Sequence, residues 1–142
     1  MTKRISAPSA VEMSRTDDSR YDPWRHAATL GIPVAVRRLR SANGYWFPEY
    51  REILLGDHLR PWAQMIVLAH EIGHASLGHV EDSDRNEWEA DRFACSHLVP
   101  PAVLDVAVRR NGSNLRAIRS ELGVTSRILR AGYTPFADSS GL

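Results

Sequence analysis

The sequence predicts an α+β protein, in which a small antiparallel or mixed sheet is followed by helices. Between residues 34 and 55, short stretches rich in Val, Tyr, Trp, Ile and Leu alternate with turn residues, which is typical of strands. From Pro61 onward, apolar residues recur at spacings of three and four, which is typical of helices. The 142 residues, 43 % hydrophobic and 25 % charged, suit one globular domain.

The N-terminal third is expected to contain a tail, a short helix and three strands. Residues 1–19 are rich in Ser, Thr and charge without periodicity, so we expect a flexible tail there. Asp22 and Pro23 are suited to start a helix over 22–30. Strands are expected at 33–39, 45–47 and 52–55, with a hairpin turn at 42–44 joining the first two into a meander.

A His-Glu-x-x-His motif lies in the predicted helix Pro61–Leu77. Residues four apart on a helix differ by about 40° around the axis and about 6 Å along it, so His70 and His74 face the same way. Two imidazole nitrogens at about 2.0–2.1 Å can occupy two corners of a zinc tetrahedron. Glu71 lies one position round the helix and can reach a water on the metal. The alternative is a buried helix with two hydrogen-bonded His, which would bury the Glu71 carboxylate at a cost.

A second acidic segment can complete the ligand set. Glu87 and Asp91 lie four residues apart on one face of the next predicted helix. Glu87 can then bind the metal while Asp91 accepts a hydrogen bond from a ligating His and orients it. Glu89 is expected to face solvent or an Arg. An ordinary salt-bridged helix is the alternative for this segment.

These motifs together resemble the ImmA/IrrE-type metallopeptidases. The resemblance rests on His-Glu-Ile-Gly-His at 70–74, on E-x-x-A-D-x-F-A at 87–94 and on Leu-Val-Pro at 98–100, and it covers roughly residues 20–135. It implies a zincin-like minimal metallopeptidase of gluzincin layout, with His70, His74 and Glu87 as zinc ligands and Glu71 as general base. The longer HExxHxxGxxH pattern does not fit, because Leu77 and Val80 stand where it requires Gly and His.

The resemblance also implies an activity and a partner. We expect a zinc-dependent metalloendopeptidase that cleaves a helix-turn-helix transcriptional repressor of a phage, a mobile element or a stress circuit. Manganese or another divalent transition metal can also suit two His and one Glu. The alternative is a non-catalytic or conditional anti-repressor that only binds its partner.

Residues 113–130 resemble a helix-turn-helix, with Thr125 or Ser126 as a cap and with Arg127 and Arg130 available for phosphates. A DNA-binding regulator is therefore a further alternative. We prefer a C-terminal helical subdomain, residues 101–142, that packs on a peptidase core of residues 20–100, because one basic helix pair is weak support for DNA binding.

Composition narrows the setting to the cytoplasm. No apolar run reaches the length of a membrane span, and the N-terminus lacks the apolar core of a secretion signal. Cys95 is the single cysteine, so no intrachain disulfide can form, and we expect it to be buried in the core. Residues 61–100 carry seven acids against two Arg, which favours a cation and disfavours a nucleic-acid groove. Minor roles remain open for His26, His58, His79 and His97, and the oxyanion-stabilising residue remains open among Tyr45, Tyr50 and Tyr133.

Overall fold

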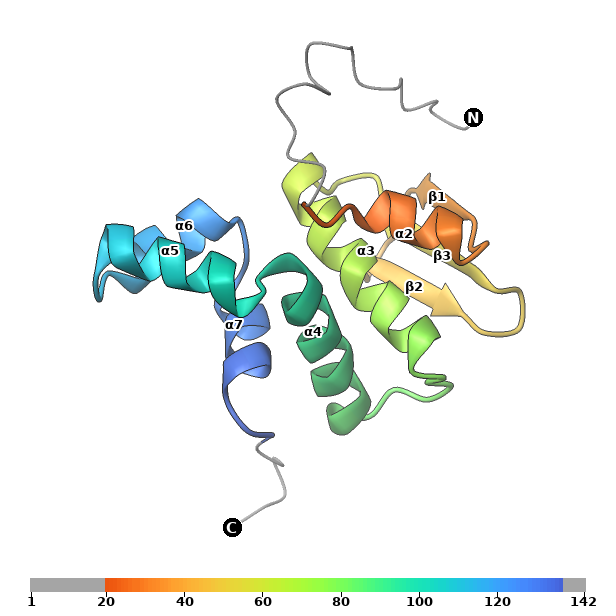
Figure 1. The fold of residues 1–142 in the computed structure, drawn as a ribbon. Coiled ribbons are helices and arrows are strands. Elements are labelled where there is room, and N and C mark those ends of the chain that lie inside the picture. The colour runs from red at the N-terminus through yellow and green to blue at the C-terminus, as the bar shows by residue number, and fades with distance from the viewer. Residues whose placement is uncertain (1–19, 137–142) are drawn as a thin grey trace.

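The computed structural model describes residues 20–136, so the expected tail at 1–19 lies outside the described residues. The elements are α2 (Pro23–Thr29), β1 (Val34–Arg37), β2 (Gly44–Phe47), β3 (Glu52–Gly56), α3 (Pro61–Ser76), α4 (Asp84–Leu98), α5 (Pro101–Asn111), α6 (Leu115–Leu122) and α7 (Ser126–Tyr133). This combination of helices with one small sheet confirms the predicted α+β class for the described part of the chain (Figure 1).

The sheet is mixed and its strand order is β1-β3-β2. β1 runs parallel to β3, with Val34 opposite Ile53, and β2 runs antiparallel to β3, with Tyr45 opposite Leu54. The predicted meander is therefore wrong, because β1 and β2 are not neighbours and the turn at 42–44 does not close a hairpin. β3 takes the central position because Ile53 and Leu55 are fully buried there. A local Asn-Gly signal indicates a turn but cannot say which strand becomes the neighbour.

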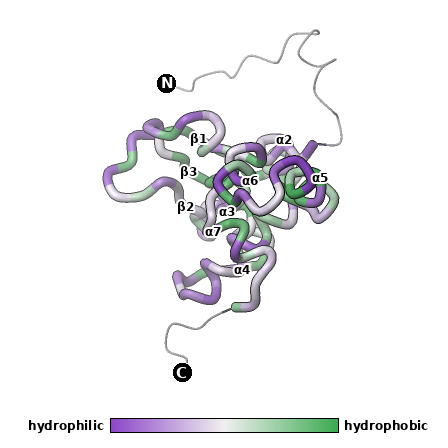
Figure 2. The backbone as a smooth tube through the Cα atoms, turned by 90° about the vertical axis from the view of Figure 1, so that its left-hand side faces the viewer, coloured by the Kyte–Doolittle hydropathy of each residue, from purple (hydrophilic) through white to green (hydrophobic). Residues whose placement is uncertain are grey.

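Helix α3 lies between the sheet and α4 and is covered on two sides (Figure 1). On the sheet side, Leu68 and Ile72 join a core cluster with β3 and α2. On the other side, Ile66 and Ala69 join a second cluster with α4 and α7. The hydropathy view shows that the apolar stretches run through β3 and α3 (Figure 2). A helix buried on two sides is expected to be apolar around most of its circumference.

The helix ends explain why the predicted boundaries hold. The Asp22 side chain caps α2 by accepting hydrogen bonds from the backbone N–H groups of Trp24 and Arg25. The Ser83 hydroxyl caps α4 by accepting from Asn86 N at 3.0 Å. Proline occupies the first position of α3, where its missing N–H costs nothing.

The last three helices lie on the side of α4 away from the sheet (Figure 1). α7 packs along α4, and its buried residues Ile128 and Leu129 belong to the second core cluster. The expected cap is confirmed, since the Thr125 hydroxyl accepts from Ile128 N at 3.3 Å. Within residues 20–136, no helix has both the length and the apolar character needed to cross a bilayer.

Candidate metal centre

Helix α3 brings His70, Glu71 and His74 to one buried place. Their relative exposures are 6, 7 and 6 %, and one ligand atom from each lies within 4.8 Å of the others. The Nε2 atoms of His70 and His74 are 3.0 Å apart, and their rings meet edge to face. The spacing of four residues therefore produces the shared orientation that the sequence predicts.

Helix α4 adds the Glu87 carboxylate to this pair. One oxygen lies 3.0 Å from His70 Nε2 and the other 3.1 Å from His74 Nε2. The two helices can approach this closely because residue 73 is glycine. A Cβ at Gly73 would lie 3.1 Å from the Cα and carbonyl oxygen of Ala90 and 3.1 Å from Phe93 Cβ.

The two Nε2 atoms and the Glu87 carboxylate, whose two oxygens each face one histidine, are spaced as in a divalent metal site. Two ligand atoms at adjacent corners of a zinc tetrahedron are separated by about 3.3 Å, and the separations at His70, His74 and Glu87 lie within a few tenths of an ångström of that value. Two imidazoles and one carboxylate are also a donor set that zinc commonly takes. The residues present therefore fit a metal ion.

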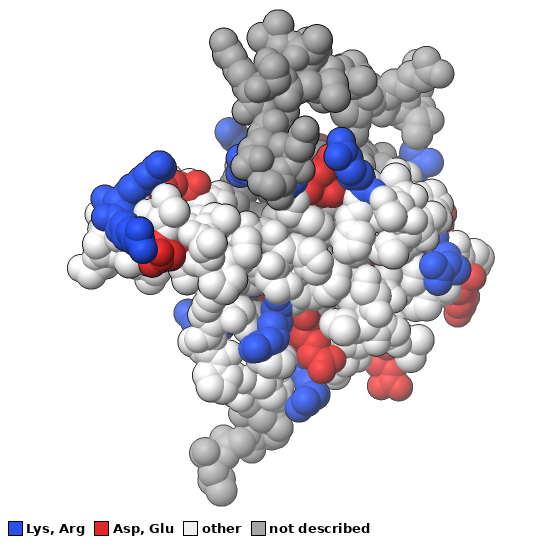
Figure 3. All heavy atoms as spheres, in the orientation of Figure 1, with Lys and Arg blue, Asp and Glu red and all other residues white. Residues whose placement is uncertain are grey.

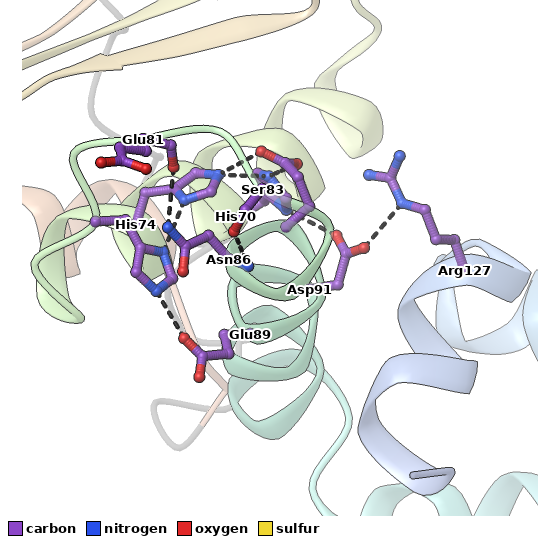
Figure 4. Close-up of polar contacts among 10 residues, drawn as sticks. His70, His74, Glu81, Ser83, Asn86, Glu89, Asp91 and Arg127 are labelled. Atoms are coloured by element: carbon purple, nitrogen blue, oxygen red, sulfur yellow. Dashed lines mark hydrogen bonds and ion pairs between the residues drawn. The ribbon is translucent and has the colours of Figure 1, made fainter. Parts of the chain in front are cut away.

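Each of the two imidazoles has a hydrogen-bond partner at its Nδ1 atom, on the side away from Glu87. The Nδ1 atom of His70 lies 2.7 Å from Asp91 Oδ1, and Asp91 in turn lies 3.1 Å from Arg127 Nε of α7 (Figure 4). A carboxylate only accepts, so Nδ1 of His70 carries a proton, and in the neutral form of the ring that a metal binds the lone pair is on Nε2, toward Glu87. The structure thus brings together all five residues that the sequence singled out.

Two further residues at the site were not assigned to it from the sequence. His79 is buried, with Nδ1 3.0 Å from His74 Nδ1 and Nε2 2.8 Å from Glu89 Oε1. Glu89 also lies 3.6 Å from Arg85, as expected, but its main partner is His79. The signal that could have found His79 is its position directly after Gly78, where a helix C-terminal turn folds the chain back on its last turn.

Charges at the site shift several pKa values. Burial acts to lower the pKa of His70, but hydrogen bonds with Asp91 and Glu87 outweigh it and raise this pKa to about 9. With no metal bound, hydrogen bonds from the Nε2 atoms of His70 and His74 hold the pKa of Glu87 well below its usual range. These directions show that the site stabilises positive charge between the imidazoles and the carboxylates.

Glu71 has the opposite tendency. Burial raises the pKa of Glu71, and the nearby His70 and His74 offset this only in part. Its carboxylate borders a cavity of about 290 Å³ that His74 and Glu87 also line. A buried carboxylate beside a cavity, with its proton affinity raised, is suited to exchange a proton with a molecule bound there.

The cavity is completed by strand β2 and by the loop after α3. Its lining includes Gly44, Tyr45 and Trp46 on one side and residues 79–82 on the other. Of the three tyrosines left open by the sequence, Tyr45 lines the cavity, whereas the Tyr133 hydroxyl donates to Val99 O at 2.5 Å. Tyr50 is 71 % exposed and is not among the lining residues.

The other histidines are placed elsewhere. His58 is exposed and its Nε2 lies 3.0 Å from Asn43 Oδ1. His26 and His97 form an aromatic cluster with Tyr21 and Phe93. None of these three histidines joins the candidate centre in the described part of the chain. Burial raises the pKa of the Cys95 thiol to about 11, which agrees with the expected core position.

The C-terminal helices contribute to the site through Arg127, which pairs with Asp91. The Arg127 Nε atom contacts Asp91, and α7 buries one face against α4. At the far end of the helical group, Arg109 pairs with Asp105 at 2.8 Å and Arg110 with Glu121 at 3.1 Å. On the face drawn in Figure 3, acidic side chains accordingly lie beside the basic ones over these helices. This arrangement favours a packing role over a DNA-binding role.

Comparisons with known proteins agree with this geometry. The Deinococcus deserti protein named radiation response metalloprotease IrrE is 31 % identical over 117 residues, covering 69 % of this chain and 42 % of that protein. The protein of the same name from Deinococcus radiodurans is 30 % identical over 121 residues, covering 72 % of this chain and 37 % of its own length. The chain thus matches about two fifths of the length of these curated relatives. Residues 27–132 also match the family described as the IrrE N-terminal-like domain. The chain therefore belongs to the family of IrrE N-terminal-like domains, which is a metallopeptidase family.

Proposed function

We propose that the chain is a zinc-dependent metalloendopeptidase, with His70, His74 and Glu87 as metal ligands and Glu71 as general base. The observation that carries the proposal is the convergence of two buried imidazole nitrogens and one carboxylate at mutual distances of 3.0–3.1 Å. Zinc fits this donor set best, and manganese or another divalent transition metal is the alternative metal ion. The zincin-like character of the fold is part of the same proposal.

The reaction follows from what each side chain can do. A divalent metal held by the three ligands would lower the pKa of a water molecule and polarise a peptide carbonyl. Glu71 accepts the proton of the attacking water and delivers it to the leaving amine, for which its raised pKa is suited. Asp91 fixes His70 in the tautomer whose Nε2 lone pair faces the site.

Strand β2 offers a way to hold an extended substrate. β2 is an edge strand whose paired side faces β3, and its residues Gly44, Tyr45 and Trp46 border the cavity beside Glu71. A peptide that adds to a free sheet edge is held by main-chain hydrogen bonds, largely independent of its sequence. We therefore place the substrate backbone along β2, which requires the target segment to be extended.

We further propose that the substrate is a helix-turn-helix repressor in the cytoplasm, where such repressors work. This part rests on the resemblance to ImmA/IrrE-type proteins. The proposed organisation is a peptidase core of residues 20–100 carrying a helical subdomain of residues 101–142, of which 137–142 lie outside the described residues. Two contacts support it, namely the α4–α7 packing and the pair between Arg127 and Asp91.

The test compares wild-type protein with Glu71→Gln on a candidate repressor encoded nearby. Glu71→Gln should retain zinc, measured by metal analysis, and lose cleavage by at least about 100-fold, because general-base catalysis contributes about 10²–10⁴-fold. His70→Ala should lose both zinc and cleavage. Equal neutralisation of the repressor by wild type and Glu71→Gln, without cleavage by either, would refute the peptidase and support the binding-only alternative. Zinc retained after replacement of both His would refute the ligand assignment.

A further inference from the structure

The end of α3 places His79 against His74 through the backbone. The N–H of Gly78 donates to Ala75 O at 3.3 Å, and the N–H of His79 donates to His74 O at 3.0 Å. This pair of bonds is the Schellman turn, which requires a left-handed residue that Gly78 supplies with φ +70°. The ring of His79 consequently meets the ring of His74, with centroids 5.2 Å apart.

The hydrogen-bond partners determine which nitrogen carries each proton. The Nε2 atom of His79 lies 2.8 Å from the Glu89 carboxylate, which can only accept, so His79 is protonated on Nε2. A neutral imidazole has one donor and one acceptor, so Nδ1 of His79 is the acceptor. When both rings are neutral and Nε2 of His74 is kept free for a metal, the Nδ1 atom of His74, 3.0 Å away, is the donor. His74 is left with a lone pair on Nε2, the atom that faces His70 and Glu87.

We propose that Glu89 and His79 form a positioning relay that holds His74 in the tautomer able to bind a metal. This inference rests on the proposed metal site and adds two residues to it. Asp91 fixes the tautomer of His70 by a direct hydrogen bond at Nδ1, whereas Glu89 fixes the tautomer of His74 through the imidazole of His79.

The relay matters because His74 has a competing partner. Its Nε2 atom lies 3.1 Å from Glu87 Oε1, so a proton on Nε2 would form a hydrogen bond to Glu87. That hydrogen bond would occupy His74 Nε2 and Glu87 Oε1, the two atoms that would bind the metal, and so compete with metal binding. With Nδ1 of His74 committed as a donor to His79, the neutral ring has no proton left for Nε2. The relay therefore keeps the site open for a cation.

The relay also connects two separate segments. His79 lies in the turn after α3, two residues beyond Leu77. Glu89 lies on α4 (Figure 4). His79 is 9 % exposed, so the hydrogen bond that it accepts is protected from water. Loss of either member should weaken the metal site without removing a ligand.

The test measures zinc affinity by competition with a chelator in variants of residue 79. His79→Phe keeps a ring and the backbone turn but offers no acceptor, and we expect zinc binding about 10- to 100-fold weaker, the size found for outer partners of metal ligands. His79→Asn places an amide oxygen near the position of Nδ1, so we expect it to restore most of the affinity. His58→Phe is the matched control at an exposed histidine and should bind zinc as wild type does.

The second readout is the tautomer itself. Nitrogen-15 histidine spectra of the zinc-loaded protein should show the His79 proton on Nε2 and an unprotonated Nδ1. Glu89→Ala should weaken this preference and lower zinc affinity, whereas Arg85→Ala should change neither. Glu89 is partly exposed, so its variant decides the question if His79→Phe fails to fold.

The outcomes separate the two proposals. Zinc binding by folded His79→Phe or Glu89→Ala with wild-type affinity would overturn the relay and leave the proposed function standing. A His79 proton on Nδ1 in wild-type protein would do the same. Wild-type protein that binds no zinc would overturn the proposed function and the relay together.

Discussion

Replacing Gly73 by Ala should separate the two helices that carry the metal ligands. The added Cβ would lie 3.1 Å from three atoms of α4, two of them in the backbone of Ala90. Carbon atoms in favourable contact are about 3.5–4.0 Å apart, so α3 and α4 must separate locally by a few tenths of an ångström. Because the clash is with the Cα and carbonyl oxygen of Ala90, removing its methyl group by Ala90→Gly should give no rescue.

The expected effect on stability is small, and the effect on metal binding is larger. Overpacking costs about 1–3 kcal/mol, and the better helix propensity of Ala returns about 1 kcal/mol, so unfolding in EDTA should show a net loss of about 0–2 kcal/mol. Metal–ligand distances tolerate only about 0.2 Å, and Glu87 reaches the His pair from the displaced helix. Zinc affinity should fall about 10- to 100-fold, as for other losses of support around metal ligands.

The assay is chelator competition at fixed pH, combined with urea unfolding of the metal-free protein. Gly132→Ala is the matched control, since this glycine of α7 also meets α4, but at Cys95 instead of beside Glu87. The control should lose stability and keep its zinc affinity. A folded Gly73→Ala protein with unchanged zinc affinity would refute the reasoning that close helix approach positions Glu87.

Three further predictions concern stability and reactivity. In EDTA, protonated His70 should stabilise the fold by up to about 3 kcal/mol below about pH 6.5, and this contribution should be lost as the pH rises through the His70 pKa of about 9. Urea unfolding at about pH 6 and about pH 10 measures the difference in the free energy of unfolding. Asp91→Asn should remove most of that difference. Leu68→Ala should lower the free energy of unfolding by about 2–5 kcal/mol in the same assay, because Leu68 is fully buried between α3 and the sheet. A decrease below about 1 kcal/mol, the size expected at an exposed site, would contradict this. Cys95 should resist thiol reagents at about pH 8 until urea unfolds the chain, because burial keeps its pKa near 11; rapid labelling of native protein would count against it.

The helices that carry the candidate site could be predicted because their signals are local. The sequence signals at Pro61 and Gly78 predict where the helix carrying His70 and His74 begins and ends, and the observed α3 covers Pro61–Ser76. The pairing of the strands could not be predicted in the same way. β1 and β3 are separated by β2 in the chain but are neighbours in the sheet, and their pairing depends on which strand buries most apolar surface.

The sequence by itself determined that His70 and His74 share a helix face with Glu71 beside them, because helix periodicity fixes neighbours four residues apart. Only the tertiary structure decided that Glu87 meets this pair, because that contact depends on how closely two helices pack at Gly73. It also decided that Glu89, expected to face solvent or an Arg, pairs with His79 as well as with Arg85. Local spacing specifies which side chains one helix presents, whereas contacts between elements depend on packing distances that no single segment encodes.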